Sequence, residues 1–249
     1  MADINEILPN GDIVPHSEYS DRVNKKLDSL LKMIGRYKDE HDRRNPAHYG
    51  TSEAAYPYRL FEGSMYHGTD VAGIDRLYPS AYDNSMGLGV YLAADKGTAE
   101  LFANNVYAIH KLRGEKVGEP VVYEAKTRRK LALLDLTKDE LFKDVVADFR
   151  IYVNRYGHEA AIDNSAKSMA DRAMWEGKVL DDMGRFVFSA FPEQFTEFLY
   201  RRGYDGIING GENSKYAPFD KGVGTYTQIV VFNPEDIEIK GSYKPESKI

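Results

Sequence analysis

The amino-acid sequence predicts an α+β fold, and two observations lead to this prediction. Residues 18–44 repeat apolar side chains at helical spacing, with charged side chains between them. From about residue 59 the pattern changes to short β-like runs that alternate with helical segments. The chain has 249 residues and an apolar content of 42%, which is enough for one ordinary core.

The first 58 residues predict an N-terminal extension. Residues 1–17 show little periodicity and predict an irregular arm. The helix over 18–44 needs a partner surface, either on its own domain or on another protein. Residues 45–58 contain two prolines and a glycine, which is typical of a linker. The apolar positions of the helix are Val23, Leu27, Leu30, Leu31 and Ile34.

Residues 59–240 predict the main domain, with a helical insertion over 137–202. Asp95 can cap a helix over 95–109, and a capping-box pattern at 137–140 opens another. Residues 158–176 are also compatible with a helix. The strands are expected at 59–66, 89–93, 119–125, 131–136 and 228–232. A last helix is expected from Pro192 to Gly203, and a polar tail over 241–249.

The composition excludes several classes of site. No cysteine is present, so disulfides, thiol catalysis and cysteine-based zinc sites are excluded, and no histidine pair has zinc spacing. We therefore expect no metal. The net charge of −6 gives no long-range attraction for phosphate backbones. A basic run at 126–130 is either a phosphate contact or a solvated turn. With no secretory signal and no apolar membrane segment, we expect a cytoplasmic protein with no membrane contact.

Two segments carry the most informative pattern. Tyr66-His67-Gly68-Thr69 offers one imidazole and a small-residue bend between short apolar stretches. Gly87-Leu88-Gly89-Val90-Tyr91-Leu92 offers a glycine-relieved strand that ends in an aromatic ring. Three further segments follow in order. They are Val121–Ala125 with Leu134–Leu136, Gly203–Ile208, and Gln228–Ile237.

In this order, the five segments resemble the His-Tyr-Glu class of ADP-ribosyltransferases, the class of diphtheria toxin and the poly(ADP-ribose) polymerases. The resemblance covers roughly residues 61–239 and is strongest to small bacterial and phage-type domains. It implies two short, mostly antiparallel sheets around an NAD cleft, with flanking helices. It also implies transfer of ADP-ribose from NAD to a protein or nucleic acid, with release of nicotinamide. Such proteins are often toxins, effectors delivered into a host cell, or phage–host conflict proteins, with an antitoxin or inhibitor as a partner.

The resemblance also implies roles for single residues. His67 matches the histidine that hydrogen-bonds the adenosine-side ribose. Gly68 would offer its backbone groups to the nicotinamide carboxamide, and Thr69 would add a hydroxyl nearby. Tyr91 matches the tyrosine that stacks on the nicotinamide ring, and Phe102 would cover the other face of that ring.

The sequence departs from the family at one catalytic position. The family has a glutamate four residues before the Phe of the strand-ending turn, and this chain has Gln228 before Phe232. An amide can hydrogen-bond the ribose, but it cannot stabilise the positive charge of an oxocarbenium-like state. Losing one such contact typically costs about 3 kcal/mol, roughly a hundredfold in rate.

Three explanations for Gln228 stay open. The chain is a deliberately inactivated Glu→Gln form, a natural variant that uses glutamine, or a relative that only binds. Glu212 lies in the loop before the strand and could substitute. Glu235 and Glu238 follow the turn and are expected to face solvent.

The loop over 209–227 lies where the family places its acceptor-recognition loop. Its glycines allow movement, and its aromatic and basic residues suit contacts with protein or nucleic acid. An ordinary surface loop is the alternative. The candidate acceptor residues are Lys215, Tyr216, Phe219 and Tyr226. Two rival functions also stay open, an NAD glycohydrolase with water as the acceptor, and a non-catalytic module that binds NAD or a partner.

Overall fold

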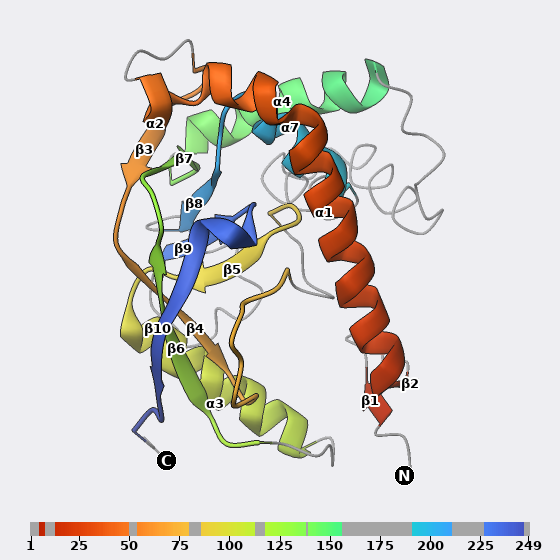
Figure 1. Cartoon of the computed structure of the whole chain (residues 1–249), viewed down its shortest axis with the longest axis vertical. Helices are drawn as coiled ribbons and strands as arrows, with labels where there is room; N and C mark the ends of the chain where they lie inside the picture. The colour runs from red at the N-terminus through yellow and green to blue at the C-terminus, as the bar shows by residue number, and fades with distance from the viewer. Residues whose placement is uncertain are drawn as a thin grey trace.

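The computed structural model describes residues 5–7, 13–49, 54–79, 86–112, 118–137, 139–155, 191–210 and 227–246. These residues form helices and a mixed β-sheet, so the predicted α+β class is confirmed (Figure 1). Helices α4 (Asp139–Arg155) and α7 (Pro192–Tyr200) lie at one end of the sheet. Helix α3 (Lys96–Leu112) covers the other end.

Eight strands form the main sheet, in the order β10-β6-β4-β5-β9-β8-β7-β3. The β7–β8 pair is parallel, and the other pairs are antiparallel. The strands are β3 (Tyr58–Phe61), β4 (Ser64–Thr69), β5 (Val90–Ala93), β6 (Val121–Thr127), β7 (Leu131–Asp135), β8 (Gly206–Gly210), β9 (Thr227–Val231) and β10 (Ile237–Tyr243).

The prediction of two separate short sheets is wrong. Strands β4 and β5 pair at Tyr66 and Ala93, and this pair joins the strands on either side into one sheet. The junction is narrow, because β4 pairs with β6 along its whole length but with β5 at this position alone. A separate ribbon of β1 (Asn5–Ile7) and β2 (Ile13–Pro15) lies within the arm that was predicted to be irregular.

The sheet is strongly curled. Residues 128–130 alone connect β6 to β7, although four strands lie between these two in the sheet. A flat sheet would place them about 24 Å apart, and this connection reaches at most about 14 Å. The sheet therefore folds back on itself, and an apolar cluster fills the space inside. The cluster takes Met65, Ala125 and Ile237 from one half of the sheet and Leu131, Ile208 and Ile229 from the other. In Figure 1, β4, β6 and β10 cross the direction of β5 and β9 steeply.

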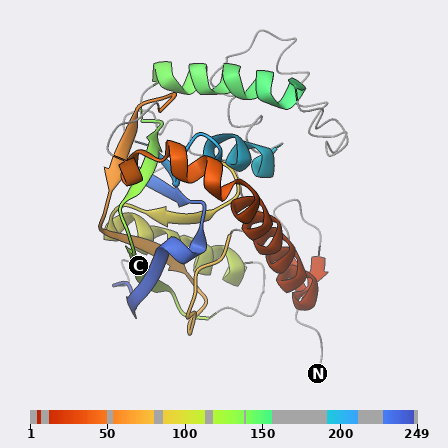
Figure 2. The same cartoon turned by 45° about the horizontal axis from the view of Figure 1, so that its top comes forward.

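Helix α1 (His16–Arg44) confirms the predicted N-terminal helix. Its buried residues Leu30 and Ile34 join a core cluster that includes Phe195 and Phe198 of α7. The apolar face of the helix therefore packs on its own chain, which is the first of the two alternatives given above. Figure 2 shows the C-terminal half of α1 beside α7 and beneath α4.

Residues 45–58 were predicted as a linker, but the described parts of this range, 45–49 and 54–58, pack against the domain. Asn45 is buried, and its side-chain oxygen accepts the backbone N–H of Ala47 at 2.7 Å. Pro46 then opens the short helix α2 (Pro46–Tyr49). A proline at the first position of a helix lacks only an N–H that has no helical partner. The pattern of asparagine followed by proline thus marks a helix start here and not a linker.

The predicted starts of two other helices are confirmed, although α3 runs three residues beyond the predicted end at 109. Asp95 caps α3, because its Oδ1 accepts the backbone N–H of Thr98 at 2.8 Å. Helix α7 begins at Pro192 and is followed by Gly203, whose φ of 87° favours glycine. The helix predicted over 158–176 lies outside the described residues.

The polar tail predicted over 241–249 is partly a strand. Strand β10 extends to Tyr243 and pairs with β6, with a register shift between Ile239 and Gly241. Backbone pairing at a sheet edge does not need apolar side chains, so the polar sequence concealed it. Among the described residues, no helix is long and apolar enough to cross a membrane.

Candidate functional site

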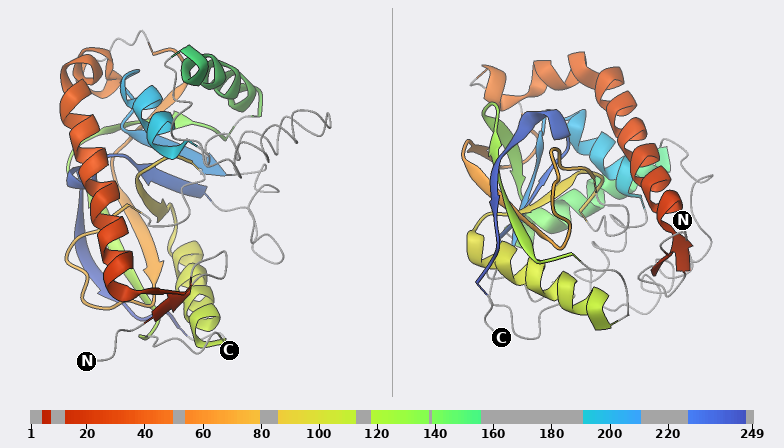
Figure 3. Two further views of the ribbon diagram at one scale, coloured as in Figure 1. Left: turned by 90° about the vertical axis from the view of Figure 1, so that its right-hand side faces the viewer. Right: turned by 60° about the horizontal axis from the view of Figure 1, so that its bottom comes forward.

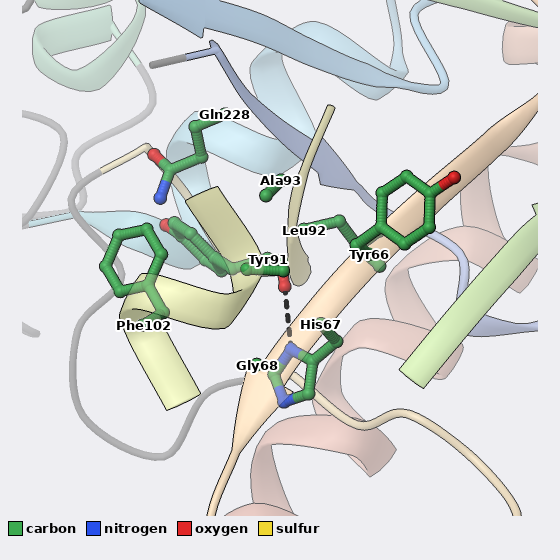
Figure 4. Close-up of a pocket in the computed structure, with 9 residues that line it drawn as sticks. Tyr66, His67, Gly68, Tyr91, Leu92, Ala93, Phe102 and Gln228 are labelled. Carbon is green, nitrogen blue, oxygen red and sulfur yellow. Dashed lines mark hydrogen bonds between the residues drawn. The ribbon is translucent and has the colours of Figure 1, made fainter. Parts of the chain in front are cut away.

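A cleft opens at the narrow junction between β4 and β5. Side chains and backbone from β4, β5, β9 and α3 line it, and Figure 4 shows the lining side chains. The described residues enclose about 120 Å³, less than the roughly 300 Å³ of a small pocket for a whole ligand. The cleft therefore has room for one flat end of a larger ligand. The lining residues are Tyr66, His67, Gly68, Tyr91, Leu92, Ala93, Ala99, Phe102 and Gln228.

His67 holds β4 against β5 where the two strands separate. Its Nδ1 lies 3.1 Å from the backbone oxygen of Tyr91. A carbonyl oxygen can only accept, so Nδ1 carries the proton and donates. Burial lowers the pKa of His67, although the bond to Tyr91 opposes this shift. The ring is therefore neutral at pH 7, and its Nε2 is an acceptor for a hydroxyl group.

Two hydrogen bonds of its hydroxyl fix the Tyr91 ring. Its hydroxyl donates to the carbonyl of Gly87 at 2.7 Å and accepts the N–H of Met86 at 2.9 Å. The ring packs against the core cluster on its inner side. Figure 4 shows it reaching toward Phe102 and the end of Gln228. A fixed and partly exposed ring is suited to stacking against a flat ligand.

Gln228 completes the cleft from β9. It pairs with Ala93 on one side and with Asn209 on the other, which fixes the direction of its side chain. Its amide forms no hydrogen bond with the residues that the structure describes, and Figure 4 shows the amide turned toward Phe102. A half-buried amide of this kind can donate to and accept from a ligand.

Gly68 is required by the packing of α3. A Cβ atom at this position would lie 1.9 Å from the carbonyl oxygen of Ala99 and 2.8 Å from the nitrogen of Ala103. Only a glycine lets α3 approach β4 this closely. Thr69 lies at the end of β4 but is not among the residues that line the cleft, and its hydroxyl accepts the N–H of Val71.

The structure thus brings together five of the predicted residues and leaves others apart. His67, Gly68, Tyr91, Phe102 and Gln228 line one cleft, although up to 161 positions separate them in the sequence. The acceptor residues Lys215, Tyr216, Phe219 and Tyr226, like Glu212, lie outside the described residues. The other two candidate carboxylates pair away from the cleft, Glu235 with Arg76 and Glu238 with Lys240.

Thr196 on α7 supports the cleft and was missed by sequence reasoning. Its buried hydroxyl accepts the N–H of Leu88 at 2.7 Å and donates to the carbonyl of Leu88 or of Pro192. The neighbouring Gly87 has a φ of 89°, and a Cβ there would meet the Thr196 hydroxyl at 2.8 Å. Thr196 therefore holds the turn to which Tyr91 is bonded. A lone threonine in a helix gives no sequence signal for this role.

Asp205 organises a buried ionic cluster near the other end of the sheet. Its carboxylate accepts from Arg129 at 2.7 Å, from the Asn45 amide at 2.9 Å and from the backbone N–H of Ala132 at 2.7 Å. Burial raises the pKa of Asp205, but His41 and Arg129 outweigh it and lower the pKa to about 2. The cluster is structural, because all of these donors face the same carboxylate.

Arg129 ties the curled sheet together through this cluster. It also binds Asp236, at 2.7 and 2.9 Å, so one guanidinium joins the residue before β10 to the residue before β8. Burial raises the pKa of Asp236. The basic run at 126–130 was predicted to be a phosphate contact or a solvated turn. Arg129 fits neither alternative, since it has two internal carboxylate partners.

Comparisons with family models, with curated proteins and with solved structures found no match for this chain. The site's function is therefore inferred from its own geometry. The cleft offers a fixed aromatic wall, a neutral imidazole acceptor and an unbonded amide within one small space. Such a set can hold a flat ring and the hydroxyl groups of an attached sugar.

Proposed function

We propose that this protein transfers ADP-ribose from NAD to a protein or nucleic acid acceptor and releases nicotinamide. The observation that carries the proposal is the meeting of His67, Tyr91 and Gln228 around one cleft at the β4–β5 junction. The resemblance to His-Tyr-Glu transferases rests on the sequence, where these residues lie far apart. Their convergence supports an ADP-ribosyltransferase-like arrangement of the curled sheet.

The proposed chemistry breaks one bond and forms another. The bond between the ribose C1′ and the nicotinamide nitrogen breaks, and both electrons go to the nitrogen, which becomes neutral. An acceptor lone pair then bonds to C1′, and the acceptor loses a proton. The positive charge that develops on the ribose needs a nearby negative charge for stabilisation.

Each residue has a role that follows from its geometry. The Tyr91 ring, held through Met86 and Gly87, would stack on the nicotinamide. The neutral His67 would accept from a ribose hydroxyl through Nε2. Gln228 would bind the other ribose without adding charge, so this cleft would orient NAD better than it activates it.

A second candidate function follows from Gln228 itself. Among the described lining residues there is no carboxylate. A cleft that orients NAD without stabilising the transition state would act as a binding module, or as a slow glycohydrolase with water as acceptor. The three functions differ in what leaves the cleft and where the ADP-ribose goes.

The test compares the unmodified chain with Gln228→Glu. Both are incubated with labelled NAD and cell extract, and label is followed into protein, nucleic acid and free ADP-ribose. Gln228→Glu should raise nicotinamide release about a hundredfold, since it supplies the missing charge. Gln194→Glu on α7, outside the cleft, is the matched control and should change nothing.

Three outcomes separate the functions. Label in a macromolecule supports transfer, and free ADP-ribose alone supports the glycohydrolase. Binding of NAD with no nicotinamide release by either form supports the binding module. If NAD does not bind, or if Tyr91→Ala binds it as well as the unmodified chain does, the cleft is not an NAD site.

A further inference from the structure

A second and larger cavity lies among the helices, away from the β4–β5 cleft. It encloses about 570 Å³, within the range of pockets that hold small ligands. Its walls carry Arg44 and Glu40 from α1, Asp148 and Arg155 from α4, and Arg201 and Arg202 from the turn after α7. These three helices lie close together in Figures 2 and 3, and the cavity shares no residue with the cleft.

The charges of this cavity are only partly paired. Arg44 and Arg201 share Glu40, at 3.1 and 3.0 Å, and Arg201 also lies 3.6 Å from Glu197. Arg155 and Arg202 form no ion pair with any residue that the structure describes. The walls thus hold four guanidinium groups and two carboxylates, in a chain whose net charge is −6.

Asp148, the second carboxylate of the walls, does not neutralise their excess positive charge. Asp148 accepts a hydrogen bond from the hydroxyl of Tyr56 at 2.6 Å and lies beyond ion-pair distance of the arginines. Even when Glu197 is counted with the walls, one positive charge remains. An anion in the cavity would meet this excess.

Arg202 is the most informative wall residue. Its Nη1 donates to the carbonyl of Phe198 at 2.8 Å, and its guanidinium lies 3.7 Å from the centre of the Phe198 ring. The stacking fixes the plane of the group and leaves most of its five N–H donors for another partner. Burial lowers the pKa of Arg202, and Tyr56 and Asp148 oppose this shift.

We propose that this cavity binds the phosphate group of a small phosphorylated ligand. A planar guanidinium that is already fixed can bind a phosphate through two parallel hydrogen bonds. Arg202 supplies such a group on one wall, and Arg155 and Arg44 approach from two others. The volume exceeds what a phosphate ion fills, so an organic part is expected beside it, of the size of a mononucleotide.

The test measures binding to the full chain by titration calorimetry at constant ionic strength. The probes are inorganic phosphate, diphosphate and adenosine monophosphate, and sodium chloride is the reference. Arg155→Gln should weaken binding of all three about tenfold, and it should leave the fold intact because Arg155 is exposed and makes no described contact. Arg43→Gln is the control, since Arg43 is an exposed arginine of α1 outside the cavity.

Two further measurements distinguish this site from its rivals. Arg202→Lys keeps the charge but removes the fixed fork, so it should weaken binding about as much as Arg155→Gln. Tyr91→Ala should leave the binding of adenosine monophosphate unchanged, because the cleft is elsewhere. This result does not depend on the proposed transferase function.

Several outcomes would overturn the proposal. One is no heat of binding with any probe at 10 mM, which is about the weakest affinity of use. Another is an equal loss of probe affinity in Arg155→Gln and in Arg43→Gln, which would indicate general charge attraction. Loss of adenosine monophosphate binding in Tyr91→Ala alone would assign the ligand to the cleft.

Discussion

Two polar clusters of this protein differ in how far their hydrogen bonds are satisfied. In the Asp205 cluster, one carboxylate accepts from Arg129, Asn45 and a backbone N–H, and Arg129 binds Asp236 as well. In the β4–β5 cleft, the Gln228 amide has no bond to a described residue, and His67 uses only one ring nitrogen. Both clusters lie in the same curled sheet.

The difference separates structural polar groups from groups that are available to a ligand. A buried ion whose donors are all internal holds the fold and has nothing left to bind. A group with unused donors or acceptors at the edge of a small cleft keeps that capacity for another molecule. Changes in the first cluster should therefore alter stability, and changes in the second should alter binding.

The largest effect is expected from Asp205→Ala. The substitution leaves the half-buried Arg129 with one carboxylate and removes a carboxylate acceptor of the Asn45 amide. Breaking a buried ion pair by removing one partner costs about 3–5 kcal/mol. Urea unfolding should show this loss, and Asp75→Ala, at an exposed aspartate, should stay within about 0.5 kcal/mol. A loss below 1 kcal/mol for Asp205→Ala would remove the distinction between the clusters.

A loss of stability is also expected from Gly68→Ala, here for a steric reason. A Cβ atom there would meet the backbone of Ala99, so Gly68→Ala must displace α3 from β4. Overpacking of this kind costs about 1–3 kcal/mol. The cleft should also lose ligand affinity, because Ala99 and Phe102 of α3 line it.

Gly35→Ala is the matched control for Gly68. Gly35 lies in α1, and a Cβ atom added there would have no neighbouring atom within 4 Å, so alanine should stabilise the helix by about 0.5–1 kcal/mol. Thermal unfolding of both variants checks the opposite signs. Equal melting temperatures for the two would show that α3 tolerates the extra atom.

The pH dependence of stability should report the Asp205 cluster. The pKa of Asp205 is lowered from 3.8 to about 2. Its contribution is therefore complete above about pH 4 and is lost as the pH falls toward 2. The loss is about 2 kcal/mol, and the raised pKa of Asp236 opposes part of it. Unfolding curves from pH 5 to pH 2 should show this loss of unfolding free energy in the unmodified chain and not in Asp205→Asn.

Local patterns predicted much of this fold from the sequence. Asp95 and Pro192 marked helix starts, Gly203 marked a stop, and β5 and β9 appeared as short apolar runs. These signals act over a few residues, so a sequence contains them directly. The convergence of His67, Tyr91 and Gln228 was expected from the resemblance, and the cleft brings them together.

Long-range packing was not predictable in the same way. The joining of the sheet depends on one pair, Tyr66 and Ala93, and no local pattern sets that register. The role of Arg129 depends on carboxylates 76 and 107 positions away. The sequence offered Asp205 within a motif but indicated no partner for it. Thr196 and Arg202 act through contacts that only the folded chain creates.

The smallest effect is expected from Tyr91→Phe. The substitution keeps the ring but removes the bonds to Gly87 and Met86, which should cost about 1 kcal/mol of stability. NAD affinity should fall by no more than about fivefold, whereas Tyr91→Ala should abolish it, because stacking needs the ring. Calorimetric titration with NAD measures both, with Tyr78→Phe at an exposed tyrosine as control. If the Phe variant loses as much affinity as the Ala variant, the turn held by the hydroxyl contacts the ligand, and the ring does not. The cleft would then bind through a turn that Thr196 and Tyr91 hold together.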